Sequence, residues 1–238
     1  MDIKREWDQL SEWYQSKDSR TDWLVGYPIV LEMLGNIQGK TILDYGCGNG
    51  SFSRFLVQNY PLSTVVGVDT SANAVSNAIQ KTDSSLPITY HTTHSYQDLK
   101  NFSFDHVCFN FVFCTIPNFE TITNICSLVY AQLPKGGRCV ILDPHPDSHG
   151  KKFTSFESES PREKKRGERV HVKLFTSSID LELDDYYLSE DDYRSALTQA
   201  GFSEIEIRAP IVGDVAAENV VLGAERTDPP FIIIQATK

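Results

Sequence analysis

The feature that most constrains this chain is a glycine-rich turn, DYGCGNG (Asp44 to Gly50), between an apolar run and a helical pattern. Thr41 to Leu43 form a short apolar run that suits a strand covered on both faces. Ser51 to Asn59 carry apolar residues at helical spacing, so the free amide groups at the start of that helix face the turn. Glycine lets the backbone turn sharply and lets a ligand approach without a clash with Cβ. The arrangement predicts a nucleotide-binding site.

A second apolar strand, Thr64 to Val68, ends on Asp69. A carboxylate at this place can accept hydrogen bonds from both hydroxyls of a ribose. A glycine turn, a helix and an acid at the tip of the next strand together form the mononucleotide half of a dinucleotide-type fold. The alternative is an ordinary strand-to-helix loop, in which the glycines serve only the turn.

The glycine spacing bears on which nucleotide is bound. Asp44 ends the first strand, and Gly50 stands one position before the third small residue of a dinucleotide fold, where this chain has Ser51. In these residues the chain resembles the class I S-adenosylmethionine-dependent methyltransferases, whose first motif is an acid followed by a G-x-G-x-G turn. The resemblance implies that the backbone of Gly46 to Gly50 cradles the methionine end of the cofactor, while Asp44 supports the ammonium group or the turn amides. From the residue alone, Asp44 could also be an acid that caps its own turn.

Further matches extend the resemblance over residues 39–146. Ser71 is expected to begin a helix after the ribose acid. Phe104 to Asn110 resemble the fourth strand of the family, but the following residues depart from the Asn/Asp-Pro-Pro-aromatic motif of many amino-methylating relatives. The implied cofactor is S-adenosyl-L-methionine, with contacts from Asp44, Gly46, Cys47, Gly48, Asn49, Gly50, Asp69, Thr70, Ser71, His94, Ser95, Asn110, Phe111 and Tyr14.

The remaining pattern predicts one α/β unit: a Rossmann-like seven-stranded methyltransferase sheet with helices on both faces. We expect an N-terminal helical cap at 1–36, the cofactor-binding core at 37–146, a lid insertion at 147–188 and completion of the core at 189–238. The cap contains two helical stretches, Ile3 to Tyr14 and Asp22 to Leu34, and by position Tyr14 and Tyr27 could contact ligand. Residues 151–167 are polar and predict a mobile loop, followed by a β-hairpin of Val170 to Phe175 and Ile179 to Leu183. The family normally ends with an antiparallel strand, here Phe231 to Ala236.

Catalytic residues are sought beyond the carboxyl ends of the strands, where ligands bind in open α/β sheets. His145 follows the fifth predicted strand, Arg138 to Leu142, and its imidazole could accept a proton from the acceptor. Tyr187 of the lid is a second candidate. The His145–Pro146 pair resembles toxoflavin-type and other small-molecule relatives, although a histidine bonded within a proline-rigid loop explains it as well. The alternation of acids and histidines from Asp143 to His149 could suggest a metal, but its two prolines disfavour a common geometry, and we expect none.

Composition limits the class of partner. The net charge of −10 over 238 residues argues against a nucleic-acid partner, which requires clustered Lys and Arg. No apolar stretch approaches the ~20 residues that a membrane span requires, so we expect no membrane partner. The five cysteines form no C-x-x-C pair and suit a reducing, cytoplasmic location. The expected form is a monomer or homodimer.

The sequence therefore predicts an enzyme that transfers a methyl group from S-adenosylmethionine to a nitrogen or oxygen of a small-molecule acceptor by in-line displacement. Three alternatives stay open at this point: a nicotinamide oxidoreductase, a protein or RNA methyltransferase, and a noncatalytic protein that only senses an adenosyl ligand.

Overall fold

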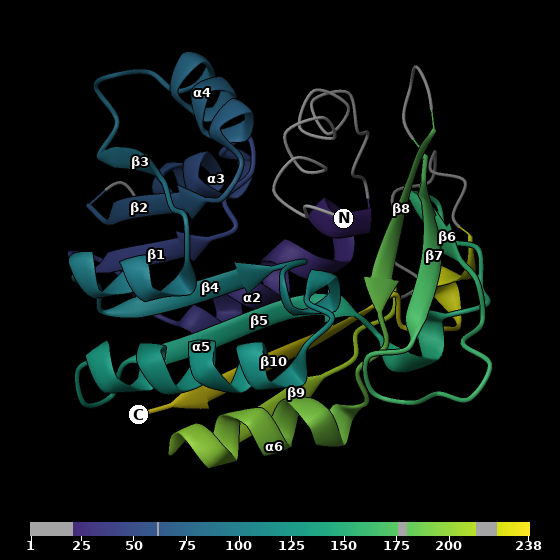
Figure 1. The fold of residues 1–238 in the computed structure, drawn as a ribbon. Coiled ribbons are helices and arrows are strands. Elements are labelled where there is room, and N and C mark those ends of the chain that lie inside the picture. Colours follow the sequence, from purple (N-terminus) through teal and green to yellow (C-terminus); the bar gives the residue numbers. More distant parts are fainter. Residues whose placement is uncertain (1–20, 61, 176–179, 213–222) are drawn as a thin grey trace.

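The computed structural model describes residues 21–60, 62–175, 180–212 and 223–238. Its centre is a sheet of seven strands in the order β3-β2-β1-β4-β5-β10-β9 (Figure 1). The strands are β1 (Thr41–Tyr45), β2 (Thr64–Asp69), β3 (Ile88–Thr92), β4 (His106–Asn110), β5 (Arg138–Pro144), β9 (Ser203–Arg208) and β10 (Phe231–Thr237). The first five are parallel, whereas β10 runs antiparallel to both of its neighbours, β5 and β9. The predicted seven-stranded sheet with an antiparallel final strand is confirmed.

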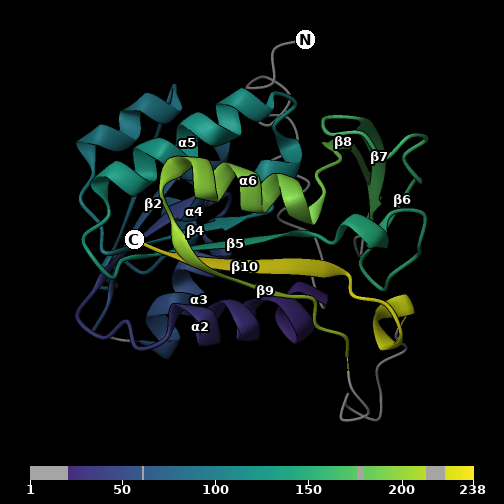
Figure 2. The ribbon, with the colours of Figure 1, turned by 90° about the horizontal axis from the view of Figure 1, so that it is seen from below.

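Helices cover both faces of this sheet, as the view from below shows (Figure 2). On one face lie α2 (Tyr27–Leu34) and α3 (Ser51–Asn59), and on the other lie α5 (Phe119–Gln132) and α6 (Glu190–Ala200). Helix α4 (Ala72–Lys81) contacts β2 and β3. Each face has its own apolar core, one containing Val30 and Leu56 and the other Val129 and Leu197, and all four side chains are fully or almost fully buried. The central strands are therefore buried on both sides, which explains their continuous apolar runs.

Several short elements complete the described chain. A one-turn π-helix, η1 (Asp22–Gly26), precedes α2, so the helix expected from Asp22 to Leu34 has two parts. Short 3₁₀ turns follow the strand ends and join other elements: η2 (Tyr96–Asn101), η3 (Phe113–Thr115), η4 (Pro146–Ser148) and η5 (Ala224–Arg226). None of the helices in the described ranges is both long and apolar enough to cross a membrane. The predicted helix Ile3 to Tyr14 lies outside the described residues.

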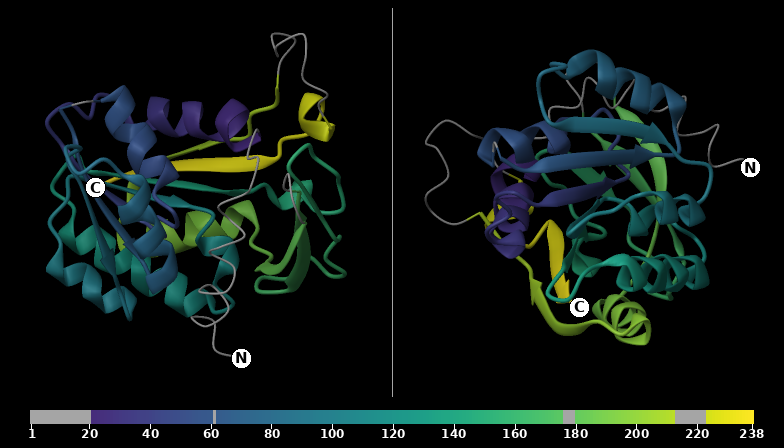
Figure 3. Two further views of the ribbon diagram at one scale, coloured as in Figure 1. Left: turned by 90° about the horizontal axis from the view of Figure 1, so that it is seen from above. Right: turned by 90° about the vertical axis from the view of Figure 1, so that its left-hand side faces the viewer.

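The insertion after β5 forms a small antiparallel sheet at the end of the large one (Figures 1 and 3). Its strands are β6 (Phe156–Ser158), β7 (Arg169–Leu174) and β8 (Leu181–Tyr186). The hairpin of β7 and β8 was expected, but β6 lies in the segment predicted to be a mobile loop, and that prediction is wrong for 156–158. Pairing with β7 and stacking of the Phe156 ring on Phe153 and Phe231, at 4.7 and 5.8 Å between centroids, order this strand. The division of the chain at residues 36, 146 and 188 stays a prediction.

Candidate functional site

The glycine turn leaves β1 at its carboxyl end and leads directly into α3. Gly46, Gly48 and Gly50 all have positive φ, at 75°, 52° and 77°, a region that other residues enter only at a cost. At Gly46 a Cβ would also lie 2.5 Å from Val112 Cγ2, whereas at Gly48 nothing lies within 4 Å of that position. Gly46 is therefore required by packing, while Gly48 leaves open space in front of the turn.

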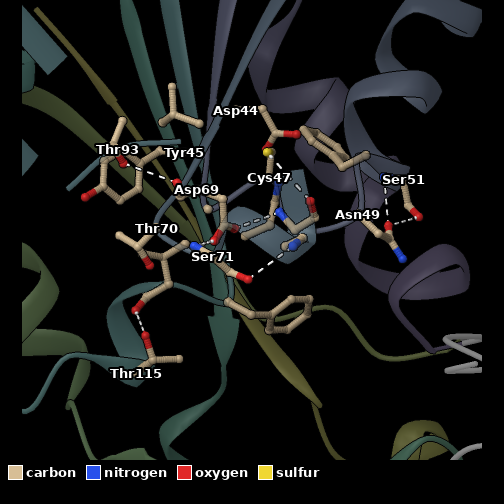
Figure 4. Close-up of a pocket in the computed structure, with 18 of the residues that line it drawn as sticks. Asp44, Tyr45, Cys47, Asn49, Ser51, Asp69, Thr70, Ser71, Thr93 and Thr115 are labelled. Atoms are coloured by element: carbon tan, nitrogen blue, oxygen red, sulfur yellow. Dashed lines mark hydrogen bonds between the residues drawn. The ribbon is translucent and has the colours of Figure 1, made fainter. Parts of the chain in front are cut away.

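Asp69 holds this turn by its carboxylate (Figure 4). Its Oδ2 accepts a hydrogen bond from the Gly48 amide at 2.9 Å, and its Oδ1 accepts one from the Ser71 amide at 2.8 Å. Ser71 is the N-cap of α4, as expected, because its side chain accepts a hydrogen bond from the Ala74 amide. Each carboxylate oxygen can accept more than one hydrogen bond, so a role in which Asp69 also accepts from the hydroxyls of a ribose is compatible with these contacts.

Asp44 makes a different contact from the one expected. Its side chain is buried and accepts from the Ser53 hydroxyl of α3 at 2.5 Å, so it is Asp69 rather than Asp44 that bonds the turn amide of Gly48. Burial raises the pKa of Asp44 to about 6, the Ser53 hydroxyl opposes this rise, and the nearby Asp69 adds to it. A fixed acid beneath the turn makes the local field negative, which suits a ligand with cationic groups.

Asn110 and Phe111 lie at the tip of β4. Both polar atoms of the Asn110 side chain are buried. The side chain lies close enough to the Asp44 carboxyl to lower its pKa, but neither polar atom makes a hydrogen bond of standard geometry in the part of the chain that the structure describes. Phe111 has φ 56°, which is rare for a bulky residue, and its amide donates to the Leu142 carbonyl at 2.7 Å. Unpaired buried amides are uncommon in folded proteins, so Asn110 fits a role in holding a bound group.

These residues line one cavity of about 590 Å³, a size within the usual range of small-molecule sites. Of the predicted cofactor contacts, those in the cavity wall are Asp44, Gly46, Cys47, Gly48, Asn49, Asp69, Thr70, Ser71, Asn110 and Phe111. Residues that the sequence did not single out for this site also line it: Asp22, Trp23, Phe52, Thr93 and a segment from Thr115 to Asn118. Only the aromatic character of the N-terminal segment signalled part of this wall in advance, through Tyr27, which also lines it.

Three predicted cofactor residues with described positions lie outside the cavity wall. Gly50 faces the Tyr90 hydroxyl instead. The amides of His94 and Ser95 donate to the Asp98 carboxylate at 2.7 and 3.2 Å, because Ser95 caps the η2 turn. Thr93, which directly precedes them, lines the cavity. Tyr14 lies outside the described residues.

The two predicted catalytic residues also lie outside the cavity wall. His145 Nδ1 accepts a hydrogen bond from the Asp147 amide at 3.1 Å, and burial lowers the pKa of its imidazole. Tyr187 is buried, with its ring 5.8 Å from that of His149. Their catalytic roles stay predictions.

The alternating acids and histidines from Asp143, inside β5, to His149 contact separate partners. Asp143 accepts from the Tyr193 hydroxyl at 3.0 Å, Asp147 pairs with Lys164, and His149 Nδ1 lies 3.2 Å from the Ser158 hydroxyl. Within the described ranges, His, Cys, Asp and Glu side chains form no group of three or more that could hold a metal ion.

Comparison with known proteins agrees with this geometry. The sequence profile of a family described as "Methyltransferase domain" matches residues 27–207. N-demethylindolmycin N-methyltransferase of Streptomyces griseus is 29% identical over 210 residues, which span 85% of this chain and 88% of that relative.

Solved structures show the same fold. An S-adenosylmethionine dependent methyltransferase from Mesorhizobium loti has a TM-score of 0.65 at 20% identity, over 93% of this chain and 99% of that one. A methyltransferase in complex with the Haloferax volcanii Trm112 methyltransferase activator has a TM-score of 0.70 at 17% identity, over 99% and 97%. Because the family profile covers more than half of the chain, this protein belongs to the methyltransferase domain family and is an S-adenosylmethionine-dependent methyltransferase.

Proposed function

We propose that this enzyme methylates a nitrogen or oxygen of a small-molecule acceptor, a metabolite or natural product. The observation that carries the proposal is the shared cavity of about 590 Å³, in which the glycine turn and Asp69 adjoin a wall of apolar and aromatic side chains. A cavity of this size is typical of sites for small ligands. Likeness to N-demethylindolmycin N-methyltransferase supports a small acceptor and favours nitrogen over oxygen. The narrower assignment to the toxoflavin-type branch rests only on the His145–Pro146 pair.

The residues of the cavity fit the cofactor in distinct ways. The open side of Gly48 and the carboxylate of Asp69 would hold the methionine end and the ribose, respectively. When bound, S-adenosylmethionine supplies a sulfonium methyl group that a lone pair of the acceptor can displace in line. The unpaired amide of Asn110 would hydrogen-bond to the cofactor ammonium or to an N–H of the acceptor.

Positioning accounts for most of the expected acceleration. Correct orientation of two reactants contributes on the order of 7 to 11 kcal/mol to lowering a barrier, so a strong base is not required. We propose His145 as the proton acceptor and Tyr187, in the lid region, as a second candidate. Because Nδ1 of His145 accepts from a backbone amide, the proton of the neutral ring resides on Nε2. Either the ring must change tautomer so that Nε2 can accept a proton, or it must rotate so that Nδ1 leaves the amide and acts as the base.

The decisive experiment identifies the acceptor. Purified enzyme is incubated with S-adenosylmethionine carrying a labelled methyl group and with a metabolite extract, and labelled products are identified by mass spectrometry. We expect label in a small molecule. Transfer of label into protein or RNA instead would refute the proposal, and binding of labelled cofactor without any transfer would support the sensor alternative. His145→Ala should leave cofactor affinity unchanged and lower turnover; unchanged turnover across the full pH range would exclude this residue as the base.

A further inference from the structure

One wall of the cavity is built from aromatic rings of three helical elements. Trp23 comes from η1, Tyr27 from the start of α2 and Phe52 from the first turn of α3, and all three line the cavity. The ring centroids of Tyr27 and Phe52 are 4.9 Å apart, and those of Trp23 and Tyr27 are also 4.9 Å apart. Since Phe52 follows the glycine turn by two residues, the wall is continuous with the part of the site assigned to the methionine end of the cofactor.

Trp23 is held in place but is not buried. Its indole makes perpendicular contacts with both Tyr27 and Phe55, at an interplanar angle of 88° in each case. The residue nevertheless stays 38% exposed, unlike Tyr27 at 8% and Phe52 at 4%. A large apolar ring that is fixed by its neighbours and still accessible in a cavity wall is a typical binding surface.

The helix geometry at this point is unusual. The Tyr27 amide donates to the Asp22 carbonyl, a spacing of five residues that defines the single π turn of η1. Such turns insert a residue into a helix and redirect side chains, and they occur often at functional sites. This π turn is the part of the chain that carries Asp22 and Trp23 to the cavity wall.

Phe111 contributes a further ring under strain. Its φ of 56° is unfavourable for a residue with a bulky side chain, and its ring contacts Phe231 edge to face at 5.2 Å. A conformation of this kind costs on the order of 1 to 3 kcal/mol and persists where surrounding structure imposes it, commonly at ligand sites. Phe111 lines the same cavity, next to Asn110 with its unpaired amide.

The charges in the cavity wall favour a basic group. Asp22, Asp44 and Asp69 line the cavity, and Lys81 is the one lysine or arginine among the described residues that also line it. Asp22 directly precedes Trp23 in the sequence and, although only 4% exposed, also lines the cavity. An amine is attracted to such a site, while a carboxylate or phosphate is repelled.

We propose that the acceptor is an amine carried on a planar aromatic ring, and that Trp23 is the residue that selects the ring. This inference rests on the proposed small-molecule function and specifies its substrate class. Stacked or edge-to-face contact between the substrate ring and Trp23 adds selectivity over a saturated ring of the same size, because an aromatic contact contributes about 0.5 to 1.5 kcal/mol beyond burial of area. That range corresponds to roughly a twofold to twelvefold difference in affinity.

The test compares benzylamine with cyclohexylmethylamine, two amines that differ in the aromaticity of the ring. Their binding to the full-length enzyme saturated with S-adenosylhomocysteine is measured by ligand-observed NMR. We expect benzylamine to bind at least threefold more tightly. Equal binding of the two amines, or binding of neither, would overturn the inference. Calorimetry with S-adenosylhomocysteine alone tests the cofactor site, and the labelled-extract experiment tests whether the acceptor is a small molecule, so a failure of this inference is distinguishable from a failure of the proposed function.

Variants of η1 assign the selectivity to a residue. Trp23→Ala should reduce the ratio of the affinities for benzylamine and cyclohexylmethylamine to near one. Trp23→Phe should restore part of the preference for benzylamine. Leu24→Ala is the matched control, because Leu24 is the next residue of η1 and is 45% exposed but does not line the cavity. If Trp23→Ala weakened the binding of both amines equally, the role of Trp23 would be structural. If it weakened the binding of S-adenosylhomocysteine to the same extent, Trp23 would be a cofactor contact. Either result would make the assignment wrong.

Discussion

Replacement of Asp143 by Asn should stabilise this enzyme at neutral and alkaline pH. Asp143 is the next-to-last residue of β5 and has no exposed surface, and its Oδ2 accepts a hydrogen bond from the Tyr193 hydroxyl. Burial raises the pKa of this carboxyl from 3.8 to about 7, although the Tyr193 hydroxyl and the Cys114 thiol oppose the rise. An acid whose pKa is raised on folding destabilises the folded state as soon as the unfolded chain ionises.

The magnitude follows from linkage. Between pH 3.8 and about 7 the folded protein keeps a proton on Asp143 that the unfolded chain has lost, so the free energy of unfolding falls by about 1.4 kcal/mol per pH unit. Above pH 7 the full cost is about 4 kcal/mol, an upper bound for a buried group. The asparagine side chain of the variant would not titrate, and its amide can still accept from Tyr193. Its extra N–H groups would cost about 1 to 3 kcal/mol if they stayed unpaired, but this cost does not depend on pH.

The assay is urea denaturation followed by circular dichroism at pH 5, 6, 7 and 8. The difference in unfolding free energy between Asp143→Asn and the unmodified enzyme should move in favour of the variant by about 3 kcal/mol from pH 5 to pH 8 and then level off. In thermal scans this corresponds to a relative gain in Tm of roughly 6 to 12 °C. Asp191→Asn, on the exposed start of α6, is the control for loss of one charge and should show little dependence on pH. A difference that stayed constant from pH 5 to pH 8 would show that Asp143 is ionised throughout and would refute the reasoning.

Three further predictions concern the cofactor site and the same buried acid. Asp69→Ala should weaken the binding of S-adenosylhomocysteine roughly 10- to 100-fold, measured by calorimetry, because the change removes the acceptor of the Gly48 amide as well as the proposed ribose contact. An unchanged Kd would exclude this role. Gly48→Ala should weaken the binding of the same ligand more than tenfold and lower the free energy of unfolding by about 1 to 2 kcal/mol. Gly136→Ala, also at positive φ with open space around Cβ, should lower only the free energy of unfolding. Equal losses of binding in the two variants would contradict the assignment. Tyr193→Phe should destabilise the enzyme by about 1 to 3 kcal/mol and more at pH 8 than at pH 5, since it deprives the Asp143 carboxylate of its donor; the reverse order in urea denaturation would contradict this.

The local patterns of the sequence were sufficient for the core of the site. Strand β1, the glycine turn and α3 are contiguous, and each is specified by residue types within a few positions: apolar runs, glycines at positive φ and helical spacing. The same holds for Asp69 and the Ser71 cap, because both are set by the end of β2. Ten of the predicted cofactor contacts line the cavity for this reason.

Contacts between distant segments could not be predicted from these local patterns. His94 and Ser95 follow β3 at the expected place, yet their amides bond to Asp98, and Thr93 takes the position in the cavity wall. Strand β6 forms because it pairs with β7 and because its Phe156 ring stacks on Phe231, although the sequence around this strand is largely polar. His145 was placed correctly after β5, but only the fold shows that its ring lies outside the cavity wall and accepts from Asp147.

By itself, the amino-acid sequence indicated the nucleotide site and, through its resemblance to a family, the cofactor class, because the glycine turn, its flanking strand and helix, and Asp69 are specified by short-range residue patterns. Tertiary structure alone decided which side chains from distant segments line the cavity and which acids are buried. Trp23 and Phe111 are 88 positions apart in the sequence and line one cavity, and Asp143 and Tyr193 meet across 50 positions. Side-chain direction and burial at such separations result from packing of whole elements, and no local pattern encodes them.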